Sequence, residues 1–179
     1  LSPSQNSTNK AFSRVALVGK FQADGIEERL QDLAKLVSEL GCEVFIEAAT
    51  AEHLKLTGFP TKVAEDFAGA IDLVVVLGGD GTMLGIGRQL AGMNVPLVGI
   101  NMGRLGYMTD IPIQSVQTIL PKIIAGEYEA DTRTLLDAVV LRNGKEINHA
   151  LALNDVVVNR SGISGMVELA VHVNGSFMY

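Results

Sequence analysis

The hydrophobic positions of this 179-residue chain follow two different periods, and the change falls at about residue 128. Before that point, uninterrupted apolar runs such as Leu73–Leu77 alternate with stretches whose apolar residues recur every three or four positions, as from Ile26 to Leu40. Uninterrupted runs are typical of strands buried on both faces, and a three-to-four spacing is typical of amphipathic helices. The alternation predicts an α/β domain built on an open parallel sheet.

The same pattern places individual elements. We expect strands over 14–18, 43–46, 73–77 and 95–100, and helices over 26–40, 83–90 and 115–125. Gly41 and Gly126 stand where glycine commonly ends a helix, and Pro121 predicts a kink or a break in the last helix. Residues 50–70 fit neither period well, and we expect a short helix, a loop and a helical turn over 63–67 there.

From Tyr128 onward apolar and polar residues alternate, which is typical of strands. Two Asn-Gly pairs, at 143–144 and 174–175, predict tight hairpins, the second after a strand over 167–173. We therefore expect a disordered tail over 1–13, a Rossmann-like open parallel sheet over 14–128, and the start of an antiparallel β domain over 129–179. A sheet that stopped at Tyr179 would expose an unpaired edge, so we expect the chain to be part of a longer protein.

The glycine-rich turn after the central apolar run is the candidate active site. Gly78, Gly79 and Gly81 surround Asp80, and Thr82 follows. Ligands of open α/β sheets bind beyond the carboxyl ends of the strands, and glycine permits positive φ and close approach of backbone amides to an anion. We therefore expect a phosphate site that includes Asp80. The alternative is a tight turn in which Asp80 is only the N-cap of the following helix.

Spacing excludes two well-known phosphate-binding motifs. A P-loop would need glycine where Arg14 stands, five residues before the Gly19-Lys20 pair. The Rossmann dinucleotide fingerprint would need a third glycine where Leu84 stands. The turn at 78–82 therefore belongs to another kind of phosphate site.

Composition and charge limit the kinds of molecule that the protein is expected to bind. A net charge of −6 without a basic cluster argues against nucleic acid and against an anionic membrane surface. The first residues contain no apolar run that could be a signal peptide or a membrane span. The single cysteine, Cys42, cannot form an internal disulfide and is expected in the core, which fits a reducing compartment. The three histidines share no metal-ligand spacing, and we assign no metal-binding residue.

Three segments together resemble the NAD kinases of bacterial type. Residues 78–82 read GGDGT, a motif that diacylglycerol-type lipid kinases and 6-phosphofructokinases share less completely. Residues 101–110 resemble the family's N-x-G-x-LGF-x-TD segment, with Tyr107 in place of the usual Phe. Residues 153–158 resemble its LNEVVV segment, with Asp155 in place of the usual Glu. Order and spacing agree as well, so the resemblance covers the chain from about Arg14 onward.

The resemblance implies an ATP-dependent NAD kinase, which phosphorylates the 2′-hydroxyl of the adenosine ribose of NAD and makes NADP. The implied donor is ATP or polyphosphate with a divalent cation such as Mg²⁺, and the implied protein is a cytoplasmic homodimer or homotetramer. Asp80 would be the catalytic base, while glycine amides and Mg²⁺ hold the triphosphate. The implied nucleotide-binding residues are Gly78, Gly79, Gly81, Thr82, Arg104, Tyr107, Asn154 and Asp155.

Alternatives stay open at this point. Asn154-Asp155 could be only a turn that enters a strand over 156–158, Tyr107 could be a core residue, and Arg104 could cap its own loop. The protein could also be another GGDG kinase that acts on a lipid or a sugar, which the segments at 103–110 and 154–155 disfavour. A non-catalytic nucleotide-sensing module is the third possibility, and binding of NAD without formation of NADP would favour it.

Overall fold

The computed structural model describes residues 10–19, 24–103, 106–159, 166 and 168–179. The chain forms two compact units, Leu1–Leu135 and Leu136–Tyr179, and each is described by itself. No helix among the described residues is long and apolar enough to cross a membrane.

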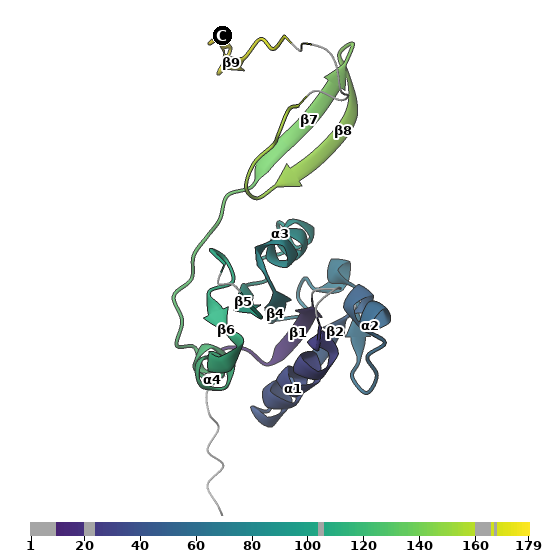
Figure 1. Cartoon of the computed structure of the whole chain (residues 1–179), viewed down its shortest axis with the longest axis vertical. Helices are drawn as coiled ribbons and strands as arrows, with labels where there is room; N and C mark the ends of the chain where they lie inside the picture. Colours follow the sequence, from purple (N-terminus) through teal and green to yellow (C-terminus); the bar gives the residue numbers. More distant parts are fainter. Residues whose placement is uncertain (1–9, 20–23, 104–105, 160–165, 167) are drawn as a thin grey trace, which may run out of the picture. The chain divides into compact units, whose positions relative to one another are not determined.

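The first unit contains a six-stranded sheet in which all neighbouring strands are parallel (Figure 1). Its strands are β1 (Arg14–Gly19), β2 (Glu43–Glu47), β3 (Thr61–Lys62), β4 (Leu73–Gly78), β5 (Leu97–Asn101) and β6 (Ile111–Pro112). Their order is β3-β2-β1-β4-β5-β6, the order of the Rossmann fold. The expected open parallel sheet is confirmed.

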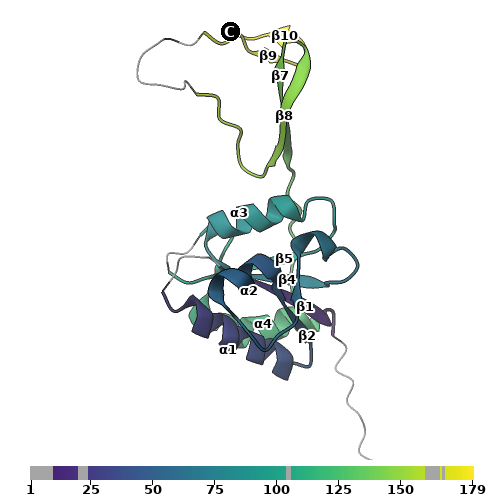
Figure 2. The ribbon, with the colours of Figure 1, turned by 90° about the vertical axis from the view of Figure 1, so that its right-hand side faces the viewer.

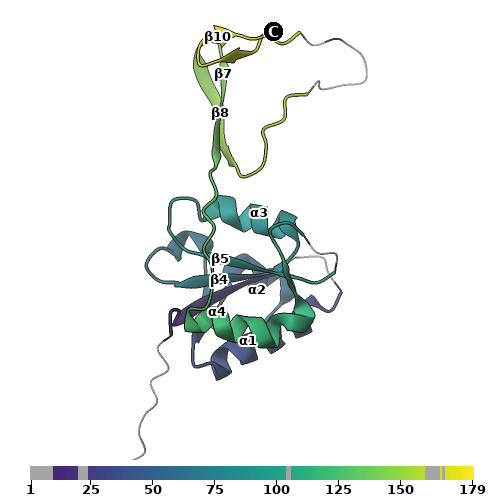
Figure 3. The same ribbon diagram turned by 90° about the vertical axis from the view of Figure 1, so that its left-hand side faces the viewer.

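Helices cover both faces of this sheet (Figures 2 and 3). They are α1 (Ile26–Glu39), α2 (Ala48–Leu54), α3 (Asp80–Gln89) and α4 (Val116–Ala125), with 3₁₀ turns η1 (Ala64–Asp66) and η2 (Ile113–Ser115). In β4, Leu73, Val75 and Leu77 lie in one core cluster with residues of α1 and α4, and Val74 and Val76 lie in another with residues of α3. The central strand is apolar throughout because each face is covered by helices.

Three local features differ from the expected pattern. The two-residue edge strands β3 and β6 were not predicted, because neither contains an apolar run. Helix α3 begins at Asp80, three residues earlier than expected. Helix α4 continues through Pro121 instead of splitting there. The carbonyl of Gln117 loses its amide partner at that proline, but Gln117 is exposed, so water can replace the bond.

The chain just before β1 packs against the first unit. Phe12 is buried, and the Ala11 amide donates to the Ile124 carbonyl oxygen at 2.9 Å. The expected tail therefore remains a prediction only for residues 1–9, which lie outside the described residues.

Cys42 is also buried, and burial raises the pKa of its thiol, as expected for an unreactive core residue.

The second unit consists of hairpins. Strands β7 (Leu136–Arg142) and β8 (Lys145–Ala152) pair antiparallel around Asn143 and Gly144, whose φ angles of 52° and 73° suit a type I′ turn. Strands β9 (His172–Val173) and β10 (Ser176–Phe177) pair around the second Asn-Gly pair. Both expected hairpins are confirmed.

Two expected strands of the second unit are absent from its described part. Residues 156–158 form no strand, and their valine side chains are exposed. Of the strand expected over 167–173, only His172–Val173 is present, while residue 167 lies outside the described residues. A strand needs a hydrogen-bonding neighbour, and no strand among the described residues of this unit pairs with residues 156–158. Val171, just before β9, exchanges backbone hydrogen bonds with Met178 and Tyr179, but the strand does not extend to it.

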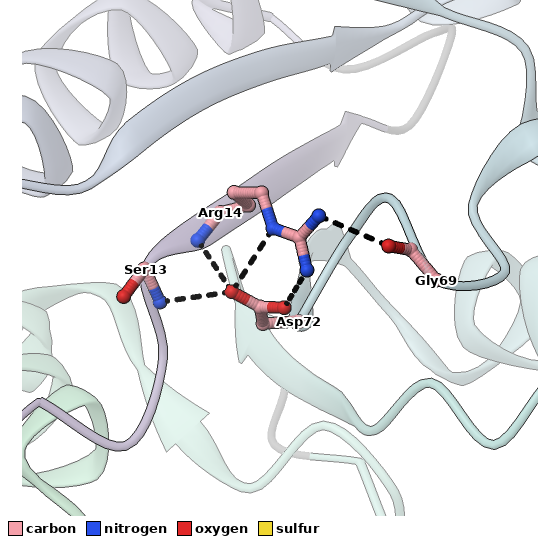
Figure 4. Close-up of polar contacts among 4 residues, drawn as sticks. All are labelled: Ser13, Arg14, Gly69 and Asp72. Atoms are coloured by element: carbon pink, nitrogen blue, oxygen red, sulfur yellow. Dashed lines mark hydrogen bonds and ion pairs between the residues drawn. The ribbon is translucent and has the colours of Figure 1, made fainter.

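An ion pair fixes the amino ends of the two central strands of the first unit (Figure 4). The Arg14 guanidinium lies 2.6 Å from Asp72 Oδ1 and also donates to the Gly69 carbonyl. Asp72 Oδ2 accepts from the backbone amides of Ser13 and Arg14 at 3.1 and 2.9 Å. The hydrogen bond from the Arg14 side chain is the main reason that the pKa of Asp72 lies below its ordinary value.

This arrangement predicts a pH-dependent contribution to stability. Because folding lowers the pKa of Asp72, the ionised carboxylate stabilises the chain above the unfolded pKa of about 3.9. That contribution is lost as the pH falls through the lower, folded pKa. We expect Asp72→Asn to reduce the free energy of unfolding by about 1 kcal/mol at pH 7, and the difference from wild type to shrink in acid.

Urea unfolding of both proteins from pH 7 to pH 3 measures this difference. Asp32→Asn is the control, because Asp32 pairs with Lys35 at 3.6 Å with both side chains largely exposed, and its effect should stay below about 0.5 kcal/mol. A difference for Asp72→Asn that does not change with pH would contradict the expectation.

Candidate active site

The candidate site lies where the chain leaves the two central strands in opposite directions. β1 leads to β2 on one side of the sheet, and its neighbour β4 leads to β5 on the other. A cleft of about 620 Å³ opens at the carboxyl ends of these strands. In open α/β sheets, this is the place where ligands bind. The residues that line the cleft are Val18, Gly19, Glu47, Ala49, His53, Gly79, Gly81, Thr82, Gly85, Ile86 and Gln89.

The glycines of the turn leave space on the wall of this cleft. A Cβ atom added at Gly79, Gly81 or Gly85 would meet no atom of the described residues within 4 Å apart from its chain neighbours and its own helix backbone. Of the two properties that glycine permits, positive φ is not used here: Gly79 has φ −114°, and Gly78 and Gly81 are not among the glycines with positive φ. Neither packing nor backbone strain therefore requires glycine at 79, 81 and 85, whereas close approach of a ligand would.

The amino end of α3 faces the same space. Gly79 is its N-cap, and Gly79, Gly81 and Thr82 all line the cleft. The first amides of a helix lack intrahelical partners, and the helix dipole adds partial positive charge at this end. A ten-residue helix that begins at a glycine-walled cleft is suited to bind an anion such as phosphate.

Asp80 does not cap its own helix. Its carboxylate faces the loop between β5 and β6, where Oδ2 accepts from the Tyr107 amide at 2.9 Å. Oδ1 accepts three bonds of 3.1 Å, from the amides of Met108 and Thr109 and from the Thr109 hydroxyl. The structural alternative that Asp80 is the N-cap is therefore wrong, because no side-chain bond caps α3.

These contacts keep the carboxyl ionised. The Tyr107 amide is the largest cause of a pKa below the ordinary value of Asp80. Desolvation acts in the opposite direction, and the remaining bonds from Met108 and Thr109 lower the pKa further. Asp80 is thus a carboxylate across the neutral pH range, and the described residues supply three donors to one of its oxygens and one donor to the other.

The other expected site residues have different surroundings. Tyr107 is 80% exposed, so it is not a core residue, and the Arg133 guanidinium lies 5.3 Å from the centre of its ring. Arg104 lies outside the described residues. Asn154 and Asp155 are exposed in the second unit, just after β8, and their placement relative to Asp80 is not defined.

Sequence reasoning missed several residues of the cleft. Glu47 ends β2 and is buried, with its carboxylate bound to the amides of Ala49 and Thr50 and to the Thr50 hydroxyl. His53, one of the three histidines to which the sequence assigned no role, also lines the cleft. The position of Glu47 could have indicated its place in the cleft, because an acidic residue at the end of the second strand contacts the ribose in many Rossmann-type sites.

Comparison with known proteins identifies the family. Residues 15–128 match the model of the ATP-NAD kinase N-terminal domain. This chain belongs to the ATP-NAD kinase family. An NAD kinase of Cupriavidus pinatubonensis is 57% identical over 168 residues, which cover 94% of this chain and 55% of that protein. An NAD kinase of Burkholderia thailandensis is 55% identical over 94% of this chain and 56% of its own length. The chain thus spans about half the length of these relatives.

Solved structures agree with the fold expected of this kinase family. A yeast NADH kinase complexed with NADH superposes with a TM-score of 0.67 at 20% identity, over 84% of this chain and 45% of that one. An NAD kinase from Archaeoglobus fulgidus in complex with ATP superposes with a TM-score of 0.54 at 25% identity, over 79% and 46%. The expected kinase family and the expected fold are both confirmed.

The close contact between Gly106 and Asp80 predicts that adding a methyl group at Gly106 destabilises the protein. A Cβ atom at Gly106 would overlap Asp80 Oδ1 and lie 2.6 Å from Thr109 Oγ1, so Gly106→Ala must displace the carboxylate or the loop. We expect the free energy of unfolding to fall by roughly 1–3 kcal/mol. Gly103→Ala in the same loop is the control, because a Cβ there meets no atom of the described residues within 4 Å. It should change the free energy of unfolding by less than about 0.5 kcal/mol. Urea unfolding compares the two, and equal effects would contradict the contact.

Proposed function

We propose that the protein is an ATP-dependent NAD kinase, which transfers the γ-phosphoryl group of ATP to the 2′-hydroxyl of the adenosine ribose of NAD. One observation carries the proposal: the GGDGT turn supplies glycines to the wall of a cleft at the amino end of α3 and carries the ionised carboxylate of Asp80 between them. This carboxylate faces the loop between β5 and β6 and is not among the groups that line the cleft. Membership of the ATP-NAD kinase family supports the choice of nucleotides.

The donor occupies the cleft in this proposal. Backbone amides at the start of α3 receive the triphosphate, and Gly79, Gly81 and Gly85 let it approach the backbone. Among the described residues, no group of three or more His, Cys, Asp or Glu could hold a metal ion. A Mg²⁺ ion would therefore enter with the donor phosphates, where it neutralises their charge, as this ion commonly does in kinases.

Asp80 acts on the acceptor. The ribose 2′-oxygen forms a bond to the γ-phosphorus, the bond from this phosphorus to the bridging oxygen of ADP breaks, and the hydroxyl proton passes to Asp80 Oδ2. The products are NADP, ADP and, after release to solvent, a proton. A carboxylate of low pKa is a weak base, so its main contribution is to orient the hydroxyl and accept the proton late.

The remaining parts of the proposal come from the resemblance. Tyr107, Asn154 and Asp155 contact NAD, and Arg104 contacts phosphate. The full protein assembles as a homodimer or homotetramer in the cytoplasm, and polyphosphate is an alternative donor.

The direct test is an assay for NADP with the natural full-length protein, NAD, ATP and Mg²⁺. The proposal expects NADP and ADP in equal amounts. Tight binding of NAD with no NADP formed would contradict the proposal and favour a nucleotide-sensing module.

If ATP binds in this cleft, one substitution in α3 should stabilise the protein and at the same time weaken ATP binding. Gly85 lies inside α3 with open space at its Cβ position, so Gly85→Ala should raise helix stability by about 0.5–1 kcal/mol. The same methyl group fills part of the donor cleft, and we expect the dissociation constant of ATP to rise by roughly tenfold or more.

Calorimetric titration of ATP together with urea unfolding measures both changes. Ser38→Ala, on the exposed side of α1, is the control, because it also favours the helix but lies away from the cleft. Unchanged ATP affinity in Gly85→Ala would remove the cleft as the donor site.

A further inference from the structure

A chain of buried hydrogen bonds leads to Asp80 from the end of β5. Thr109 is fully buried and Asn101 is 5% exposed, and they are two of only four buried polar side chains among the described residues. Buried polar groups destabilise a fold unless they are hydrogen-bonded. Both of these are bonded, and their bonds end on the Asp80 carboxylate.

The direction of these bonds is determined by the chemistry of each group. The Gly103 amide donates to Asn101 Oδ1 at 2.7 Å, so the amide nitrogen of Asn101 faces Thr109. Asn101 Nδ2 donates to Thr109 Oγ1 at 3.0 Å and occupies the acceptor side of the hydroxyl. The hydroxyl proton is therefore directed to Asp80 Oδ1, 3.1 Å away.

Packing fixes the orientation of the Thr109 side chain. A Cβ atom at Gly99 would lie 2.7 Å from Thr109 Cγ2 and 2.9 Å from the Met108 carbonyl oxygen. The methyl group of Thr109 thus occupies the space that Gly99 leaves beside β5. With the methyl in that space and the hydroxyl bonded to Asn101 and Asp80, χ1 of Thr109 places the hydroxyl on the Asp80 side.

The result is a carboxylate whose two oxygens differ. Among the described residues, Oδ1 receives three donors and Oδ2 receives the Tyr107 amide alone. We propose that Thr109 is a positioning residue for phosphoryl transfer, because its hydroxyl, oriented by Asn101, anchors Asp80 Oδ1 and leaves Oδ2 for the attacking hydroxyl. This role rests on the proposed kinase function.

Kinetics of two substitutions test the role. Thr109→Val keeps the methyl packing but removes the hydroxyl, so kcat should fall roughly 10- to 100-fold with little change in the KM values for NAD and ATP. Thr109→Ser keeps the hydroxyl and should recover most of kcat. Thr118→Val, on the exposed side of α4, is the control and should behave as wild type. Equal losses for Val and Ser at position 109 would show that only packing matters and would overturn the proposal.

The pKa of Asp80 provides a readout that does not require turnover. Its lowered value comes from the loop donors, with no contribution from another charged side chain among the described residues. Thr109→Val removes one donor and should raise this pKa in a ¹³C carboxyl titration by NMR, whereas Thr109→Ser should not.

The outcomes separate the two proposals. An active enzyme in which Thr109→Val leaves both kcat and the pKa of Asp80 unchanged would overturn the role of Thr109 alone. A wild-type protein that forms no NADP, yet shows the expected rise of the Asp80 pKa in Thr109→Val, would overturn the kinase proposal while leaving the hydrogen-bond network correct.

Discussion

The carboxylate of Asp80 joins the end of β4 to the loop that follows β5, and the geometry of the candidate site depends on this contact. The two segments are 27 to 29 residues apart in sequence, and four hydrogen bonds connect them through one side chain. A single ionised group thus fixes the turn, the amino end of α3 and the loop that carries Tyr107. Loss of the carboxylate would leave backbone amides without their acceptor, which destabilises a fold as well as a site.

The rest of the first unit supports this contact through glycine. Gly99 and Gly106 have no side chain because Thr109 and Asp80 occupy the space where a Cβ would lie. Gly79, Gly81 and Gly85 have open space instead, and they form the wall of the cleft. The first group is required by the packing of the protein, whereas the second is explained by a ligand. This distinction separates structural from functional glycines within one short region of the sheet.

Much of the fold could be predicted because its signals are local. The apolar run of β4, the spacing of α1 and the two Asn-Gly turns each depend on neighbouring residues, and the structure confirms them. Edge strands of two residues carry no such signal, and residues 156–158 show that an apolar run alone does not make a strand.

Only the part of the site that depends on a local sequence motif could be predicted. The motif located Asp80 and the glycines, but it could not show whether glycine is needed for positive φ or for close approach, or which groups the carboxylate binds. Thr109 lay within a segment that resembled the family, yet its position beside Asp80 arises only when β4 and β5 pair. Contacts between distant segments follow from the topology, which the residue pattern specifies only in outline.

The most direct test of the account is turnover by Asp80→Asn in the natural full-length protein, measured with the dissociation constant of NAD. Asparagine offers one acceptor oxygen instead of two, so the anchor on the loop survives in part while the basic oxygen is lost. If Asp80 takes the hydroxyl proton, kcat for NADP formation should fall by on the order of 10²–10⁴ while NAD still binds, and Asp66→Asn, an exposed charge-matched control in η1, should retain wild-type rates. A near-normal kcat for Asp80→Asn would contradict it, because the carboxylate would then only hold the loop.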